Sequence, residues 1–173
     1  IVFGVAGTGF VVGGILVAKF GLGKNPIRTL LWAAVVMGVL GALFTIREWW
    51  LLFAIGMWLY MVLIPLMEAA EQTVIQRVTP YKRQGRVFGF AQALESAAAP
   101  LTAFAIAPLA EFWIIPAMDK PENQAALSWL LGTGDARGIA LIFLITGVIM
   151  VLLALWAFST KSYRLLSATY EKA

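Results

Sequence analysis

Two residue types that carry much of protein chemistry are missing from this chain, which contains no cysteine and no histidine. Their absence excludes disulfide frameworks, thiolate nucleophiles and the usual zinc ligands. Charge is also scarce, because Asp, Glu, Lys and Arg make up 13% of the sequence, against about 25% in soluble domains. We therefore expect neither a cofactor nor an enzymatic activity.

Apolar residues, by contrast, are abundant. They form 61% of the 173 residues, and the mean hydropathy is +0.87. A soluble protein of this length could not bury so much apolar surface, whereas a bilayer makes burial unnecessary. The basic residues lie between apolar runs and not in a separate domain, so they indicate membrane topology and no nucleic-acid partner. The composition predicts an all-α, polytopic membrane protein whose first partner is the lipid bilayer.

Five apolar runs predict five transmembrane helices, so that residues 1–173 form one transmembrane bundle. The runs cover residues 1–18, 29–46, 50–70, 87–110 and 138–160. Gly9 and Gly13 in the first run have the spacing that favours close helix packing, with cavity lining as the alternative. Trp49 and Trp50 precede the third run as expected interfacial anchors. Glu111–Arg137 is the longest polar stretch, and a short tail ends the sequence.

The connector Gln72–Gly89 joins the third and fourth runs and carries Arg77, Lys82, Arg83 and Arg86. Short loops rich in Lys and Arg lie on the cytoplasmic side of membranes. With the connector inside, ten basic residues flank the spans on the inner side and three on the outer side. This asymmetry predicts an outside N-terminus and a cytoplasmic C-terminus. Arg86 is expected to form an ion pair with a carboxylate across the inner face.

Glu95 is the leading candidate for chemistry because it lies inside the fourth apolar run, near the predicted middle of the bilayer. An acidic residue at that depth costs about 2.5–3.5 kcal/mol, so it should face a cavity or a partner. Gln92, Ser96 and Thr102 extend a polar stripe along the same helix. We assign this stripe to a substrate or proton pathway. The alternative is a structural glutamate satisfied by a neighbouring span.

A second polar group lies at the end of the third run. Glu68 and Gln72 are four residues apart on one helix face, and we assign them to the same substrate or proton pathway. A predicted inner gate of ion pairs has the following members: Arg77, Arg83, Arg86 and Glu71. The alternative is a helix end entering water, with Glu68 or Glu71 paired to a nearby arginine.

Two other features are less specific. Phe88, Phe90 and Phe104 are candidates for the lining of a drug cavity, with lipid-facing packing as the alternative. The GTGD motif at 132–135 is similar to a phosphate loop, but no Walker lysine and serine follow it, so it predicts a turn.

The turn Gly13–Lys24, GGILVAKFGLGK, resembles a degenerate copy of the inner-loop motif of the major facilitator superfamily, Gly-x-Leu-Ala-Asp-Arg-x-Gly-Arg-Arg. Four positions match this motif: Gly14, Leu16, Lys19 and Gly21. Ala18 stands where the motif has Asp, so a charge latch built on that Asp is absent from this repeat. The segments GRVFG, Pro100-Leu101, Pro108-Leu109-Ala110 and GTGDARGIAL resemble the branch with macrolide-efflux and siderophore-export proteins.

As a whole, the chain resembles the C-terminal half of such a transporter, spans eight to twelve of twelve. An odd number of spans, with a helix already running at residue 1, predicts that the N-terminal half is missing from this sequence. The resemblance implies proton-coupled export of a small amphipathic molecule by alternating access, in a bacterial inner membrane. The expected partners are the N-terminal half, the small-molecule substrate and protons, with other membrane subunits as further candidates. The alternatives are a transport-inactive accessory or assembly subunit of a larger membrane complex, and a channel or permease subunit.

Overall fold

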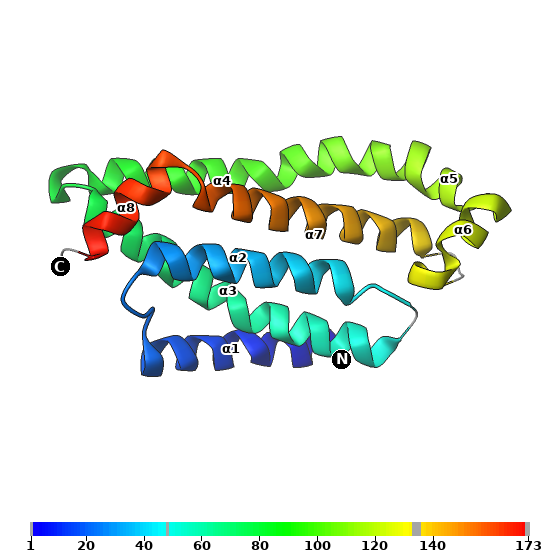
Figure 1. Ribbon diagram of the computed structural model, residues 1–173, viewed down its shortest axis with the longest axis horizontal. Coiled ribbons are helices and arrows are strands. Elements are labelled where there is room, and N and C mark those ends of the chain that lie inside the picture. Colours follow the sequence, from blue (N-terminus) through cyan, green and yellow to red (C-terminus); the bar gives the residue numbers. More distant parts are fainter. Residues whose placement is uncertain (1, 48, 133–135, 172–173) are drawn as a thin grey trace.

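A computed structural model (Figure 1) describes residues 2–47, 49–132 and 136–171. Its helices, in chain order, are α1 (Val2–Phe20), α2 (Pro26–Leu43), α3 (Trp50–Val78), α4 (Tyr81–Leu109), the π-helical turn η1 (Ala110–Ile114), α5 (Ile115–Met118), α6 (Pro121–Leu131), α7 (Arg137–Phe158) and α8 (Lys161–Glu171). No strand occurs in these ranges. The predicted all-α class is therefore confirmed.

Four helical segments are long and apolar enough to cross a membrane: α2, α3, the run from α4 through α5, and α7. Gly4–Phe20 of α1 is also apolar but shorter. These helices are compatible with an integral, multi-pass membrane protein. The fifth span stays a prediction.

The surface of the molecule is large and apolar. Its accessible area is 11640 Å², whereas a soluble protein of this mass would expose about 8300 Å². On α7, Leu152 is 60% exposed and Leu153 is 58% exposed, while Ala140, Gly147 and Ala154 are buried. Helices that bury small residues and expose large apolar ones are typical of a lipid environment, where close backbone packing replaces hydrophobic burial.

Four helices, α1, α2, α3 and α7, form what we call the packed block. Within it, α2 lies between α3 and α7, and α1 packs on α3. The seam between α2 and α7 is closed by two glycines. A Cβ atom on Gly147 would lie 2.6 Å from the Gly38 oxygen, and one on Gly38 would lie 2.9 Å from the Gly147 oxygen. The two backbones are therefore in direct contact.

α1 and α3 pack together at Gly9 and Gly13, the two glycines whose spacing the sequence showed. A Cβ on Gly9 would lie 2.6 Å from the Trp58 oxygen, and one on Gly13 would meet the Val62 carbonyl. Gly14, one residue further, faces open space. The predicted role of Gly9 and Gly13 in close helix packing is confirmed.

The turn between α1 and α2 follows from its residue types. Gly21 has φ +69° and its N–H donates to the Val17 carbonyl at 2.8 Å, a glycine C-cap that ends α1. The Asn25 side chain accepts a hydrogen bond from the Arg28 N–H at 3.3 Å, and Pro26 occupies the first turn of α2. Both features favour a helix start at this point.

The predicted connector Gln72–Gly89 is almost entirely helical, with only Thr79 and Pro80 outside α3 and α4. α3 therefore continues past residue 70, where the third apolar run was expected to end, and the expected basic loop shortens to two residues. The Gln84 side-chain amide donates to the Gln76 oxygen at 3.0 Å and to the Thr79 oxygen at 3.2 Å. These bonds join α3 and α4 at the turn.

The polar stretch after the fourth apolar run and the C-terminal tail contain helices that the sequence analysis did not predict. A π-helical turn, η1, follows Pro108 and lets the helix continue to Met118. Pro121 then starts α6, which ends at Gly132 with φ +78°. The rest of the predicted GTGD turn lies outside the described residues. The tail forms α8, which crosses the end of the molecule.

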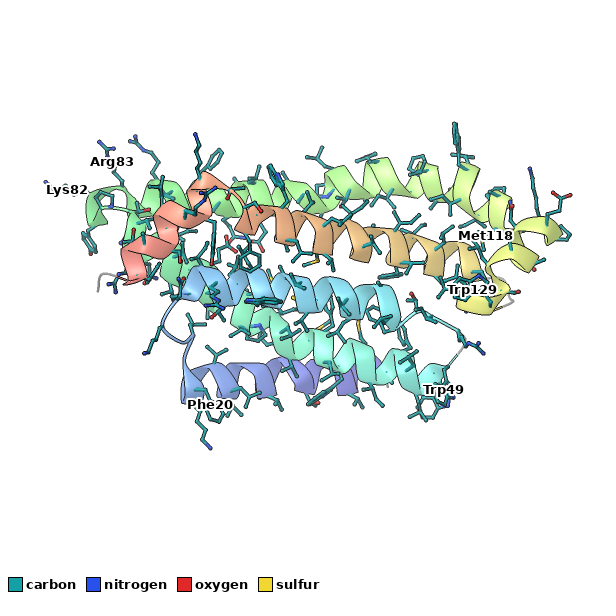
Figure 2. All side chains as sticks on the ribbon, viewed as in Figure 1. Phe20, Trp49, Lys82, Arg83, Met118 and Trp129 are labelled. Carbon is teal, nitrogen blue, oxygen red and sulfur yellow. The ribbon has the colours of Figure 1, made fainter. Side chains whose placement is uncertain are left out.

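Basic residues gather at one end of the molecule, which we call the basic end (Figures 1 and 2). Nine described basic residues lie on the helix ends and turns there: Lys19, Lys24, Arg28, Arg77, Lys82, Arg83, Arg86, Lys161 and Arg164. The opposite end holds Arg47, Lys120 and Arg137. Lys172 lies outside the described residues. The two predicted groups are thus at opposite ends, while the side that each end faces stays a prediction.

Candidate proton and substrate cavity

α3 and α4 run antiparallel from the basic end, and a cavity of about 270 Å³ lies between them. Its lining comprises Glu68, Glu71, Gln72, Ile75, Phe88, Ala91, Gln92 and Glu95. Positions 68, 71, 72 and 75 follow the spacing of one face of a helix, as do positions 88, 91, 92 and 95. The cavity therefore forms where one face of α3 meets one face of α4. We call it the acidic cavity.

The acidic cavity joins two polar groups that the sequence analysis assigned to one pathway from separate helices. Glu95 and Gln92 reach it from α4, and Glu68 and Gln72 reach it from α3. Glu71, predicted as part of the inner gate, lies in the same lining. The hairpin thus brings four of the six predicted pathway residues into one site.

Two predicted pathway residues lie elsewhere. Ser96 and Thr102 do not line the cavity. The Thr102 hydroxyl donates to the Ala98 oxygen at 2.8 Å, so it is satisfied within its own helix. Only the half of the α4 polar stripe that is nearer the basic end therefore lines the acidic cavity.

The apolar part of the lining was foreseen only in part. Phe88 lines the cavity, as one sequence alternative predicted. Phe90 and Phe104 are outside it, 70% and 83% exposed. Ile75 and Ala91 were missed, although each lies on the same helix face as the polar residues beside it.

The lining carries three carboxylates and no basic side chain. Glu68, Glu71 and Glu95 are all exposed in the described bundle. Ionised carboxylates accept hydrogen bonds, and protonated ones also donate, so such a site can take up and release protons or bind a cationic group. Within the part of the chain that the structure describes, no three His, Cys, Asp or Glu side chains are placed to hold a metal ion.

Exposed tryptophans serve as reference points for the depth of the acidic cavity along the helices. Trp50 is 70% exposed and Trp113 is 73% exposed, and both lie at the opposite end, as interfacial tryptophans do. At 1.5 Å per residue, Glu68 lies about 27 Å from Trp50, and Glu95 lies about 27 Å from Trp113. A hydrocarbon core is about 30 Å thick. Glu68 and Glu95 therefore lie at the same depth along their helices. This depth is nearer the basic end than the middle of the bilayer, where Glu95 was expected from its position in the fourth apolar run.

The arginines of the predicted gate lie at the basic end outside the cavity lining. The Arg77 guanidinium lies 5.2 Å from the centre of the Tyr170 ring, and so contacts an aromatic ring of α8 instead of a carboxylate. The Tyr170 hydroxyl donates to the Thr73 oxygen at 3.4 Å. Burial raises the pKa of Tyr170, and the nearby Arg77 offsets part of that rise. The ion pairs of the gate, including that of Arg86, stay a prediction.

Comparison with known proteins adds no assignment. No family model, curated protein or solved structure matches the chain.

Proposed function

We propose that the chain is the C-terminal bundle of a secondary active transporter of the major facilitator superfamily, which exports a small amphipathic molecule in exchange for protons. The supporting observation is the convergence of Glu68, Glu71 and Glu95 on one cavity between two apolar helices. Acidic residues inside membrane helices are costly and commonly mark ion and proton pathways.

In this proposal, Glu95 and Glu68 bind the coupling protons. Gln72 and Gln92 offer amide groups to the polar part of the substrate, and Phe88 contacts its apolar part. Protonation removes negative charge from the cavity. A neutral cavity loses less hydration free energy than a charged one when the bundle turns it away from water. The two protonation states therefore favour different orientations of the bundle, and this difference couples protons to transport.

The exposure of α4 supports a second bundle as the partner. None of its residues is buried, and apolar side chains such as Leu94 and Leu101 are 64% and 68% exposed. Beside the acidic cavity, such a surface suits contact with an N-terminal half that completes the pathway. The proposed location is a bacterial inner membrane with the basic end in the cytoplasm, as the charge asymmetry favours.

The test is proton-driven movement of a fluorescent amphipathic dye in vesicles that contain this chain together with the proposed N-terminal half. Glu95→Gln keeps the shape of the side chain and removes its ionisation, so it should abolish dye movement driven by a pH gradient while leaving downhill dye exchange. Glu122→Gln is the matched control, because Glu122 is an exposed carboxylate on α6 at the opposite end. Full pH-driven movement in the Glu95→Gln variant would overturn the coupling role.

The second candidate is a transport-inactive accessory or assembly subunit of a larger membrane complex. The observation that favours it is Ala18, which stands where the inner-loop motif has its Asp. A scaffold would use the exposed face of α4 for a partner subunit and would not need its carboxylates. Retention of partner binding by a Glu68→Gln/Glu95→Gln variant, with no pH-driven dye movement in the parent protein, would favour this candidate.

A further inference from the structure

The C-terminal helix α8 is docked across the basic end and does not continue α7 (Figure 1). At its start, the Thr160 hydroxyl oxygen accepts a hydrogen bond from the Tyr163 N–H at 3.2 Å. In its middle, Ser167 is 8% exposed and its Oγ accepts a hydrogen bond from the Asn25 side-chain amide at 2.6 Å. The Tyr170 contacts described above tie it to α3. One face of α8 is therefore held against the packed block.

The other face of α8 combines charge with an apolar side chain. Lys161, Arg164 and Leu165 share this face by their spacing, and all three are exposed. Leu165 is 72% exposed. Arg164 uses one N–H group on the Ser159 oxygen at 3.3 Å, and a guanidinium has five such donors. This face therefore presents two cations and one apolar side chain to the surroundings of the basic end.

Aromatic contacts place the start of α8 at the level of an interface. Phe158, at the end of α7, lies 5.6 Å from the Trp32 ring and 5.1 Å from the Tyr163 ring, between ring centres. Trp156 beside it is 67% exposed. Along α7, Trp156 is about 29 Å from Arg137, close to the thickness of a hydrocarbon core of about 30 Å. Lys161 and Arg164 therefore come just beyond the apolar layer, where lipid headgroups lie.

We propose that the outer face of α8 binds anionic phospholipids of the surrounding bilayer, with Lys161 and Arg164 on the phosphate groups and Leu165 among the upper acyl chains. Charge complementarity favours this occupant, because the basic end concentrates positive charge at the level where anionic headgroups lie. Only Ser159 and Thr160 separate α8 from the apolar helix α7, which keeps the face at that level. The inference depends on membrane insertion and is independent of transport.

The test uses the absence of native cysteine. The chain with Leu165→Cys, labelled with an environment-sensitive fluorophore, is reconstituted into vesicles of phosphatidylcholine with and without phosphatidylglycerol. Brominated lipids of each kind then compete as quenchers of the label. We expect an apolar emission spectrum and preferential quenching by the brominated phosphatidylglycerol. Each basic side chain near an anionic surface contributes about fivefold, so Lys161→Gln/Arg164→Gln should reduce this preference by up to about 25-fold at low salt.

Lys120→Gln is the control for charge as such, because Lys120 is exposed at the opposite end. It should leave the lipid preference at position 165 unchanged, and the melting temperature of the double variant should equal that of the labelled parent. Emission typical of water in both kinds of vesicle overturns the insertion of Leu165. An unchanged preference in the double variant, or an equal loss in the Lys120→Gln variant, overturns headgroup binding by α8.

Discussion

In the packed block, α2 and α7 touch through the backbones of Gly38 and Gly147, whereas α4 has 29 residues and buries none of them. The block is joined by small residues whose replacement would force helices apart. α4 carries internal prolines, exposed apolar side chains and half of the acidic cavity. The contrast teaches that the two regions differ in how closely they are packed, while α3 of the block and α4 each supply half of the acidic cavity. Substitutions of the seam glycines should change folding, and substitutions on the cavity faces of α3 and α4 should test the proposed activity.

The largest expected effect concerns whether α4 crosses the membrane at all. Lys82 lies near its start and Lys120 follows α5, at opposite ends of a helical run of 38 residues. In intact cells, a membrane-impermeant thiol reagent should label Lys120→Cys fully and Lys82→Cys not at all, with the reverse in inverted vesicles. Labelling of both from one side would mean that α4 does not span, and the contrast with the block would lose its basis.

Gly147→Ala should give the largest loss of stability among conservative changes. The added methyl group would lie 2.6 Å from both the Gly38 oxygen and the Ala42 nitrogen, and such overpacking costs about 1–3 kcal/mol. Gly89→Ala on α4 is the matched control, because nothing lies within 4 Å of its Cβ position. There the change should stabilise the helix by up to about 1 kcal/mol. Thermal melting in lipid nanodiscs measures both, and equal shifts would refute the special role of the block.

A smaller, local effect is expected at the end opposite the basic end. Arg137 is 6% exposed and donates to the Leu131 oxygen at the C-terminus of α6. Arg137→Met leaves that carbonyl unsatisfied at a cost of about 1–2 kcal/mol. Hydrogen exchange should therefore accelerate in α6 and stay unchanged in α2. Arg47→Met is the control, since Arg47 is exposed and its bond to the Trp129 oxygen is long, at 3.4 Å. A similar acceleration in both variants would contradict a role for burial.

The smallest expected effect is on the stability of the Glu95→Gln variant. Glu95 is exposed on α4, and Gln keeps the size of its side chain and its ability to accept hydrogen bonds, so the change in stability should be less than about 0.5 kcal/mol. The melting temperature should therefore match that of the parent. A fall of several degrees would show that Glu95 is a structural residue and would join α4 to the packed block in energetic terms.

The distribution of basic residues could be predicted from the sequence because short turns between apolar runs leave them few places to lie. Helix extent was harder to predict. The connector was expected to be a basic loop, yet Arg, Lys and Gln are good helix formers and only Pro80 interrupts it. α8 was missed because its docking depends on bonds such as that between Asn25 and Ser167, which are 142 residues apart.

The acidic cavity shows the same limit. Each half of the site could be predicted, because Glu68 with Gln72 and Gln92 with Glu95 are spaced for one helix face. Their meeting depends on the rotation of α4 relative to α3, which the short break at Thr79 and the Gln84 bonds determine. Local periodicity carries no information on that rotation.

The glycine pair between α2 and α7 also has a mechanical consequence. The Gly38 carbonyl occupies the space that a Cβ on Gly147 would need, and the Gly147 carbonyl does the same for Gly38. The glycine pair therefore restricts how α2 and α7 align along their axes. A slip of α7 by one residue would bring Thr146 or Val148 toward the Gly38 carbonyl, and neither side chain fits there. Sliding along this seam would force the two backbones apart, so the glycine pair fixes the register of α2 and α7.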